Sequence, residues 1–572
     1  QEPQEQREQR EHFMSAISVE QVGSFLGFDL PDDSPQQKAR LRALTIALQS
    51  DATPTSLVSY NSSGIVALVG PLPSALAVVE ELTDVPGCLI LATQGGESGG
   101  TETRQVAGRP VPIIYGQPKT VSGFLGKFSI VVARDDGEVD LAKALDLPGG
   151  HLDVVLDLSR EPMLESEILP PGYFSPRGDS DALDQACQSI RELKGQFEKP
   201  RYVLYDPDIC AHGSRGITGC RRCLEVCPAD AIVTNGEKIE LEPHLCHGMG
   251  SCAAACPTGA LAYAYPGRTD TLDSIRRAIT TYHQETGMSP GLLFFDGAQG
   301  APELAASVTE LPDHVIPWKT EEAGSTGSEV WLSAMAYGAA SVTVMTTAKT
   351  PTSVVSSITA QIGQVKAFLF GLGWNEPLID SVISQKLIER LSGIVTETSP
   401  SAKHATFGGM DDKRTVLRAA IDHLIGQAAD LPTEIAMPSG SPFGEIRVDD
   451  GKCTLCMGCI SVCPTGAILD NKDRPCLSFI EWNCVQCSLC AKACPEQAIE
   501  LIPRLLTDAN ARMERRVLKE EAPFECLDCS KPFTTLSMIR KMEKKLAGHR
   551  MFAGDGLRRL KLCEDCRIKG MF

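Results

Sequence analysis

The stretch CTLCMGCISVCP, residues 453–464, sets its cysteines in the spacing C-x2-C-x2-C-x3-C and follows the last one with proline. A second copy, CVQCSLCAKACP, occupies residues 484–495. Thiolates this close together let a tight loop wrap three corners of a cubic iron–sulfur cluster, and the proline turns the chain after the fourth. The pattern predicts cluster ligands rather than a zinc knuckle or a disulfide knot: Cys453, Cys456, Cys459, Cys463, Cys484, Cys487, Cys490 and Cys494.

These residues resemble the bacterial two-cluster ferredoxins, over roughly 60 residues with very specific motifs. In that family the fourth cysteine of each run ligates the cluster of the other run. The resemblance implies two 4Fe-4S clusters. One would be held by Cys453, Cys456, Cys459 and Cys494, and the other by Cys463, Cys484, Cys487 and Cys490.

An earlier block, residues 205–265, repeats the module with two departures. The first lies in CAHGSRGITGCRRCLEVCP, residues 210–228, where nine residues instead of two separate the first two cysteines. We expect this Gly-rich insert to loop out and return the first cysteine to the metal. By the same resemblance, a further 4Fe-4S cluster would take Cys210, Cys220, Cys223 and Cys256.

The second departure is CHGMGSCAAACP, residues 246–257, in which Met249 stands where the pattern has cysteine. The remaining ligands are Cys227, Cys246 and Cys252. A thioether is neutral and binds cubane iron weakly, whereas three thiolates suffice for a 3Fe-4S cluster, and this run resembles those of seven-iron ferredoxins. We therefore favour 3Fe-4S. The alternatives are a 4Fe-4S cluster whose last ligand is Met249, water or another side chain such as His247, and an empty site.

The C-terminal tail carries two further pairs, CLDC and CEDC, separated by 33 residues. Two facing C-x2-C knuckles suit a tetrahedral zinc ion with four thiolates: Cys526, Cys529, Cys563 and Cys566. A rubredoxin-like iron site or another cluster is the alternative. The interval TTLSMIRKMEKKLAGHRMF, residues 534–552, predicts a basic helix. We favour a solvated helix face over a docking surface for an acidic partner.

Outside the cysteine blocks the sequence alternates short β-branched runs with helical spacing, as α/β domains do. The predicted fold class is therefore α/β plus α+β, with two ferredoxin-like dicluster modules separated by an α/β domain. The boundaries are an N-terminal α/β domain at 1–200, the first dicluster module at 201–265, a cysteine-free α/β domain at 266–440, the second dicluster module at 441–505 and a zinc-ribbon-like tail at 506–572.

Two Gly-rich stretches follow predicted strands, as phosphate-binding loops do. We interpret ATQGGESGGTE, residues 92–102, as a plain loop, because it lacks a lysine and a following helix. FFDGAQGAPEL, residues 294–304, is the better cofactor position, although Asp296 opposes an anion.

The composition narrows the function classes. The chain has 572 residues, 22 cysteines and a net charge of −19, which argues against nucleic-acid binding. No apolar run approaches the length of a membrane span, and the polar residues 1–13 contain neither an apolar signal core nor a twin-arginine pair. Clustered metal-ligating cysteines imply a reducing compartment, most simply the cytoplasm.

Three stretches carry a wider resemblance: DVVLDLSREPMLESEILPPGYFSP at 153–176, CAHGSRGITGCRRCLEVCPADAI at 210–232, and KKLAGHRMF with LCEDCRI at 544–568. They resemble large four-cluster ferredoxin-like proteins of proteobacteria that accompany molybdenum-dependent formate dehydrogenases. The resemblance implies electron transfer with, or assembly of, such an enzyme. The cysteine-free domain faintly resembles the delta subunit of methanogen hydrogenase–heterodisulfide reductase complexes. Because that subunit's cluster cysteines are missing here, we expect this domain to be a scaffold.

We therefore expect an iron–sulfur protein that relays single electrons through up to four clusters to or from a partner oxidoreductase. It would be an electron-transfer subunit or partner rather than a catalytic one, and no residue is assigned a catalytic role. Two alternatives stay open: a flavin- or nucleotide-dependent oxidoreductase subunit fed by the clusters, and an assembly or scaffold protein for a metalloenzyme.

Overall fold

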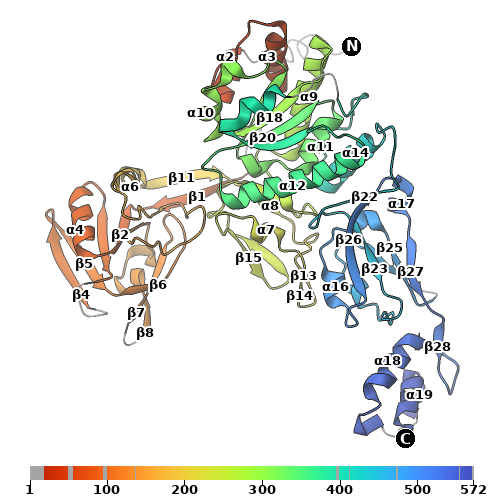
Figure 1. Cartoon of the computed structure of the whole chain (residues 1–572). Helices are drawn as coiled ribbons and strands as arrows, with labels where there is room; N and C mark the ends of the chain where they lie inside the picture. Colours follow the sequence, from red (N-terminus) through yellow and green to blue (C-terminus); the bar gives the residue numbers. More distant parts are fainter. Residues whose placement is uncertain are drawn as a thin grey trace, which may run out of the picture.

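The computed structural model describes residues 19–48, 56–94, 100–134, 137–393, 399–410, 412–471, 474–552 and 554–569. Figure 1 shows an N-terminal sheet on one side, a larger α/β domain above, two small modules below it and a tail beyond the second module. Within these ranges, every helix is too short or too polar to span a lipid bilayer. Part of the first Gly-rich stretch, residues 95–99, lies outside them.

The N-terminal domain is built on a six-stranded sheet in the order β10-β9-β2-β3-β5-β4, parallel except for β4 at the edge. Its central strands are buried on both faces, which is why they read as continuous apolar runs. The strands are β2 Ile65–Gly70, β3 Gly87–Ala92, β4 Thr101–Val106, β5 Arg109–Tyr115, β9 Val154–Asp157 and β10 Tyr173–Phe174.

Helices cover one face of this sheet and a small antiparallel sheet covers the other, so that two hydrophobic cores form. The helices of the first core are α4 Leu72–Glu81 and α6 Ser180–Glu192. The second core uses β6 Gln117–Ser122, β7 Ser129–Arg134, β8 Gly137–Asp140, α5 Leu141–Ala144 and the turn η1 Pro148–Gly150.

The middle domain contains a four-stranded parallel sheet in the order β19-β18-β20-β21. The strands are β18 Gly291–Asp296, β19 Val315–Thr320, β20 Ser341–Thr346 and β21 Ile379–Ile383. The surrounding helices are α9 Arg268–Thr286, α10 Gly300–Ala305, α11 Ser328–Ala336, α12 Thr352–Gly371, α13 Leu387–Ser392 and α14 Lys413–Ile425. Short 3-10 turns are η2 Val308–Glu310, η3 Ala323–Ser325 and η4 Ser384–Lys386.

Two N-terminal helices belong to this middle core rather than to the first sheet. They are α2 Val19–Leu26 and α3 Pro35–Ala47, drawn dark red beside α9 and α10 in Figure 1. Leu26 and Leu44 are buried in the same cluster as Ile275 on α9. The predicted unit 1–200 thus departs from the observed packing, because the described part of 1–56 folds onto residues some 230 positions later in the chain.

The two cysteine modules share one plan, in which an outer strand pair encloses a β-hairpin and two short helices. In the first module these are β12 Val203–Tyr205 with β17 Leu261–Tyr263, β15 Ile232–Asn235 with β16 Lys238–Leu241, α7 Arg222–Glu225 and α8 Ser251–Ala255. In the second they are β23 Gly444–Val448 with β26 Ile499–Leu506, β24 Ile468–Asp470 with β25 Cys476–Phe479, α15 Gly458–Ser461 and α16 Leu489–Ala493.

Further elements tie the modules to their neighbours. β1 Leu57–Ser62 and β11 Gly195–Pro200 form an antiparallel ribbon between the N-terminal sheet and the first module. The second module adds β22 Glu434–Ala436, β27 Arg516–Glu520, η5 Glu481–Asn483 and α17 Ala509–Met513. The tail consists of β28 Pro523–Glu525, β29 Pro532–Thr535, α18 Leu536–Leu546, η6 Arg550–Phe552, η7 Gly554–Lys561 and α19 Glu564–Lys569.

Candidate iron–sulfur and metal sites

The cysteine runs repeat one backbone conformation. In both complete runs, the second and fourth residues after the first cysteine are left-handed: Leu455 and Met457 in one, Gln486 and Ser488 in the other. Such residues bend the chain sharply, at a cost that a non-glycine residue carries only where the surroundings hold it there. The loop therefore keeps the three cysteines of each run around one centre.

The incomplete run adopts the same loop. Gly248 and Gly250 hold the two left-handed positions, with φ angles of 82° and 76°. Met249 lies between them, at the place of the second cysteine. Its side chain packs against the middle-domain core, and its backbone carbonyl lies against Gly324 of η3. The substitution thus changes the ligand without changing the loop.

The insert between Cys210 and Cys220 is a short β-hairpin, β13 Gly213–Ser214 with β14 Ile217–Thr218. The Cys220 backbone N–H donates to the Ala211 carbonyl at 3.0 Å, so the ends of the insert meet. The hairpin therefore returns Cys210 to the vicinity of Cys220, and the extra residues extend outward.

The raised pKa values of Cys223, Cys252, Cys459 and Cys490 each have neighbouring thiols among their causes, and these neighbours define four groups. We name each after one member. The Cys223 group is Cys210, Cys220, Cys223 and Cys256; the Cys252 group is Cys227, Cys246 and Cys252; the Cys459 group is Cys453, Cys456, Cys459 and Cys494; and the Cys490 group is Cys463, Cys484, Cys487 and Cys490. Burial is the main cause of each raised pKa, and the neighbouring thiols add to it. Ligation by these groups stays a prediction.

The surroundings of the thiols suit iron–sulfur clusters. All four thiols of the Cys223 group line one cavity, and all four of the Cys459 group line another. Backbone N–H groups point at several sulfurs: Ala498 donates to Cys494 Sγ at 3.3 Å, and Leu261 and Gln486 donate to Cys256 and Cys484 at 3.5 Å. Hydrogen bonds of this kind stabilise thiolate ligands and tune cluster potentials. The donor set therefore fits the groups that the sequence predicts.

His247, which follows Cys246, is held by the N-terminal domain. Its ring hydrogen-bonds the backbone of Leu169 in the N-terminal domain, and burial together with Lys199 lowers its pKa to about 4. The imidazole is therefore neutral near pH 7. Lys199 Nζ also donates to the Cys246 carbonyl at 2.7 Å, so the N-terminal ribbon covers this side of the Cys252 group.

The four groups form one series. Cys223 contributes to the raised pKa of Cys252, which joins the two groups of the first module. Cys459 contributes to that of Cys490, which joins the two groups of the second. Between the modules, burial, Cys484, Cys463 and then Cys220 raise the pKa of Cys487 to about 11. Along the series, the Cys252 group comes first, followed by the Cys223 group, the Cys490 group and the Cys459 group.

The inserted hairpin forms part of the contact between the modules. Lys492 Nζ on α16 donates to the Thr218 carbonyl at 2.8 Å. A Cβ added at Gly219 would lie 2.5 Å from Leu489 Cγ, so only glycine leaves room here for the Leu489 side chain of the second module. The insert therefore lies where the Cys223 and Cys490 groups meet.

The sequence did not indicate three buried residues near the contact between the two modules. Lys413 Nζ donates to the Ala253 and Ala254 carbonyls at 2.8 and 2.6 Å, directly before Cys256. Arg414 donates to Pro257 at 3.3 Å in the first module and to Trp482 at 2.8 Å in the second. His212, on the hairpin side of the Cys223 group, donates from Nδ1 to the Cys220 carbonyl at 2.9 Å. A lysine, an arginine and a histidine in loops or at a helix start carry no local signal of such roles.

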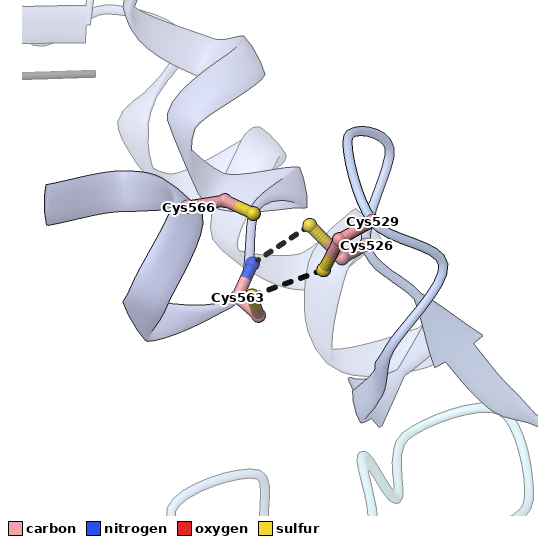
Figure 2. A group of neighbouring side chains, drawn as sticks. All are labelled: Cys526, Cys529, Cys563 and Cys566. Carbon is pink, nitrogen blue, oxygen red and sulfur yellow. Dashed lines mark hydrogen bonds between the residues drawn. The ribbon is translucent and has the colours of Figure 1, made fainter. Parts of the chain in front are cut away.

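In the tail, the four predicted zinc ligands converge (Figure 2). Their sulfurs all lie within 4.8 Å of one another, and the Cys563 backbone N–H donates to Cys526 Sγ at 3.3 Å. Although burial opposes it, hydrogen bonds from backbone N–H groups lower the pKa of Cys526 to about 6. Four convergent thiols with one readily ionised suit a tetrahedral metal site. The metal itself stays a prediction.

Three cysteines lie outside the four groups and the tail. Cys88 in β3, Cys187 on α6 and Cys476 in β25 are buried, the first two in the hydrophobic core of the N-terminal domain. They act as small hydrophobic residues. The Gly-rich turn at residues 294–304 is also satisfied internally, because the Asp296 carboxylate accepts from the backbone N–H groups of Gln299 and Gly300 at 2.6 and 3.0 Å.

Comparison with known proteins agrees with the chemistry of the modules. Residues 217–260 match the 4Fe-4S dicluster domain model, and residues 446–469 match the 4Fe-4S binding domain model. The chain is 32% identical over 83 residues to hydrogenase-4 component A of Escherichia coli (strain K12), which covers 14% of this chain and 38% of that protein. It is 33% identical over 60 residues to a ferredoxin designated 7Fe of Hydrogenibacillus schlegelii, covering 10% of this chain and 68% of that protein.

The modules and these matches identify 4Fe-4S ferredoxin domains, the domain type that holds iron–sulfur clusters. The chain belongs to the family of ferredoxins with 4Fe-4S domains. The two cysteine modules make up a small part of the chain, and the N-terminal and middle domains lie outside both matched ranges.

Proposed function

We propose that this chain is a four-cluster relay that passes single electrons to or from a redox enzyme. The observation that carries the proposal is the contact between the two 4Fe-4S modules, where Lys492 on α16 donates to the Thr218 carbonyl and Gly219 lies against the Leu489 side chain. Iron–sulfur clusters supply one-electron chemistry at potentials that the protein sets by burial and hydrogen bonds. The protein's own contribution is to fix the order and spacing of the groups.

The clusters that we propose are three of the 4Fe-4S type and one of the 3Fe-4S type, in the Cys252 group. Met249 occupies the ligand position of an otherwise intact loop, and a seven-iron ferredoxin is among the similar proteins. We also propose zinc for the tail, because four convergent thiols suit that ion.

The partner that we propose is a redox enzyme. The similar Escherichia coli protein is, by its name, a component of a hydrogenase. The sequence resemblance favours a molybdenum-dependent formate dehydrogenase. Unpaired cysteines throughout the described residues favour a reducing compartment, the cytoplasm.

Met249→Cys tests the cluster assignment. Anaerobically purified protein should contain about fifteen irons, with one zinc and an oxidised-state 3Fe-4S signal in EPR. Met249→Cys should add one iron and abolish that signal, because it restores the fourth thiolate in a loop that already has the right shape. Cys476→Ser, a buried cysteine outside the groups, is the matched control and should leave the iron content unchanged.

The relay is refuted if the anaerobic protein contains four irons or fewer. An unchanged iron count and EPR spectrum in Met249→Cys would instead refute the three-thiolate assignment alone.

A further inference from the structure

The two ends of the series differ in their access to solvent. At one end, the N-terminal ribbon and η3 of the middle domain cover the Cys252 group. At the other end, Cys456 of the Cys459 group is exposed. Because electron transfer between proteins requires close approach to a redox centre, the Cys459 group is the end that an external carrier can reach.

The tail packs beside this exposed end. Thr535, at the start of α18, donates from Oγ1 to the Thr454 carbonyl at 3.0 Å. Lys541 on α18 forms an ion pair with Glu496, and Glu496 lines the same cavity as the Cys459 group. Two independent contacts thus place α18 next to the cysteine run that contains Cys456.

The tail has the opposite charge balance from the rest of the chain. Residues 526–569 contain eleven Lys and Arg against five Asp and Glu, whereas the whole chain contains 54 against 73. On α18, Arg540 and Lys544 are exposed and one turn apart, and neither takes part in an ion pair within the described residues. A positive surface therefore stands beside the accessible end of an otherwise acidic protein.

We propose that α18 and the exposed face of the Cys459 group form a docking surface for an acidic redox protein. The inference rests on the proposed relay and adds the place of electron exchange and the charge of the partner. The step would be a one-electron transfer from the reduced carrier to the cluster that Cys453, Cys456, Cys459 and Cys494 would hold, with no covalent bond formed or broken. Opposite charges speed the encounter and fix its orientation, and added salt screens them.

The test measures electron transfer from reduced flavodoxin, a small acidic carrier, to the oxidised full-length protein by stopped flow. The variant is Arg540→Glu with Lys544→Glu. The matched control is Lys38→Glu with Lys386→Glu, which changes the charge equally at two exposed sites on α3 and at the start of α13. Iron and zinc contents are measured first for every protein, so that loss of the clusters is recognised as failure of the relay itself.

We expect the second-order rate for the α18 variant to fall at least about tenfold at about 20 mM salt, and the control to stay within about twofold. The wild-type rate should fall towards the variant's at about 500 mM salt. Ferric cytochrome c, a basic carrier that accepts electrons from the pre-reduced protein, should react no more slowly with the α18 variant than with wild type.

Equal rates for the α18 variant and wild type, with clusters intact in both, would overturn the proposal. So would an equal slowing in the control, since that reports only the total charge. Retention of the wild type, but not the α18 variant, on an immobilised oligonucleotide without any difference in flavodoxin kinetics would assign the surface to nucleic acid instead.

Discussion

Lys413 is a buried cation that interacts with Cys256 of the Cys223 group, and its replacement by methionine tests the electrostatics of this site. The ammonium donates to the carbonyls of Ala253 and Ala254 and lies 3.5 Å from Glu329, whose side chain is 8% exposed. Burial lowers the pKa of Lys413, while Glu329 and then Cys256 raise it. Methionine keeps the length of the side chain and removes the charge.

Two effects follow from Lys413→Met. Glu329 keeps a buried charge without its cation, and breaking a buried ion pair costs about 3–5 kcal/mol of stability. The cluster that we propose for the Cys223 group also loses a nearby positive charge, which had favoured its reduced, more negative state. A unit charge about 8 Å from a cluster contributes about 2 kcal/mol at an effective dielectric constant of about 20. The reduction potential should therefore fall by about 90 mV.

EPR-monitored redox titration measures the potential, and thermal unfolding of the anaerobic protein measures stability. The double variant Lys413→Met with Glu329→Gln separates the two effects, because it removes both buried charges. We expect it to regain much of the stability, and its potential should lie between those of the wild type and the single variant. A potential that rises, or does not move, in the single variant would show that Lys413 carries no effective charge beside the Cys223 group.

Two further predictions concern the junction and the middle domain. Gly219→Val should push the inserted hairpin away from Leu489 and weaken the magnetic coupling between clusters in the EPR spectrum of the reduced protein. Arg215→Ala, at the tip of the hairpin, is the control. Unchanged coupling in Gly219→Val would contradict the contact between the modules at this point. Burial and then Asp296 raise the pKa of Glu322 from 4.5 to about 8, so the folded protein binds that proton more tightly than the unfolded chain. This contribution to stability is complete below pH 4.5 and is lost as the pH rises through about 8. As the pH rises from 4.5 to about 8, the melting temperature of Glu322→Gln should therefore increase relative to that of the wild type. A difference in melting temperature that does not change with pH would refute the raised pKa of Glu322.

The sequence predicted the local structure of the cysteine runs well, because their information is itself local. Cysteine spacing fixes the loop, and Gly248 and Gly250 mark the positions that must be left-handed even where Met249 replaces the ligand. The insert after Cys210 was expected to loop out and return, and the hairpin does so. Each of these features depends on residues within about ten positions of one another.

Features that join distant segments could not be predicted. α2 is amphipathic but α3 is hardly so, and nothing in either sequence indicates that Leu44 belongs to the same core as Ile275. Arg414 lies in the first turn of α14, and it donates to backbone carbonyls of both modules, which are 157 and 68 positions away in the sequence. The pattern of hydrophobic and charged residues predicts that one face of a helix is buried. It does not predict which distant segment of the chain covers that face.

The buried cations at the junction explain how two cysteine modules can lie against each other. A cluster with four thiolate ligands is negatively charged, and placing two of them side by side in a medium of low dielectric constant is unfavourable unless positive charge lies near. Lys413 and Arg414, in the first turn of α14, provide that charge. Among the described residues, α14 is the only helix whose side chains donate to both Pro257 and Trp482. The middle domain, which supplies this helix, therefore joins the two modules, and its cations would stabilise the reduced state of any clusters that the Cys223 and Cys490 groups hold.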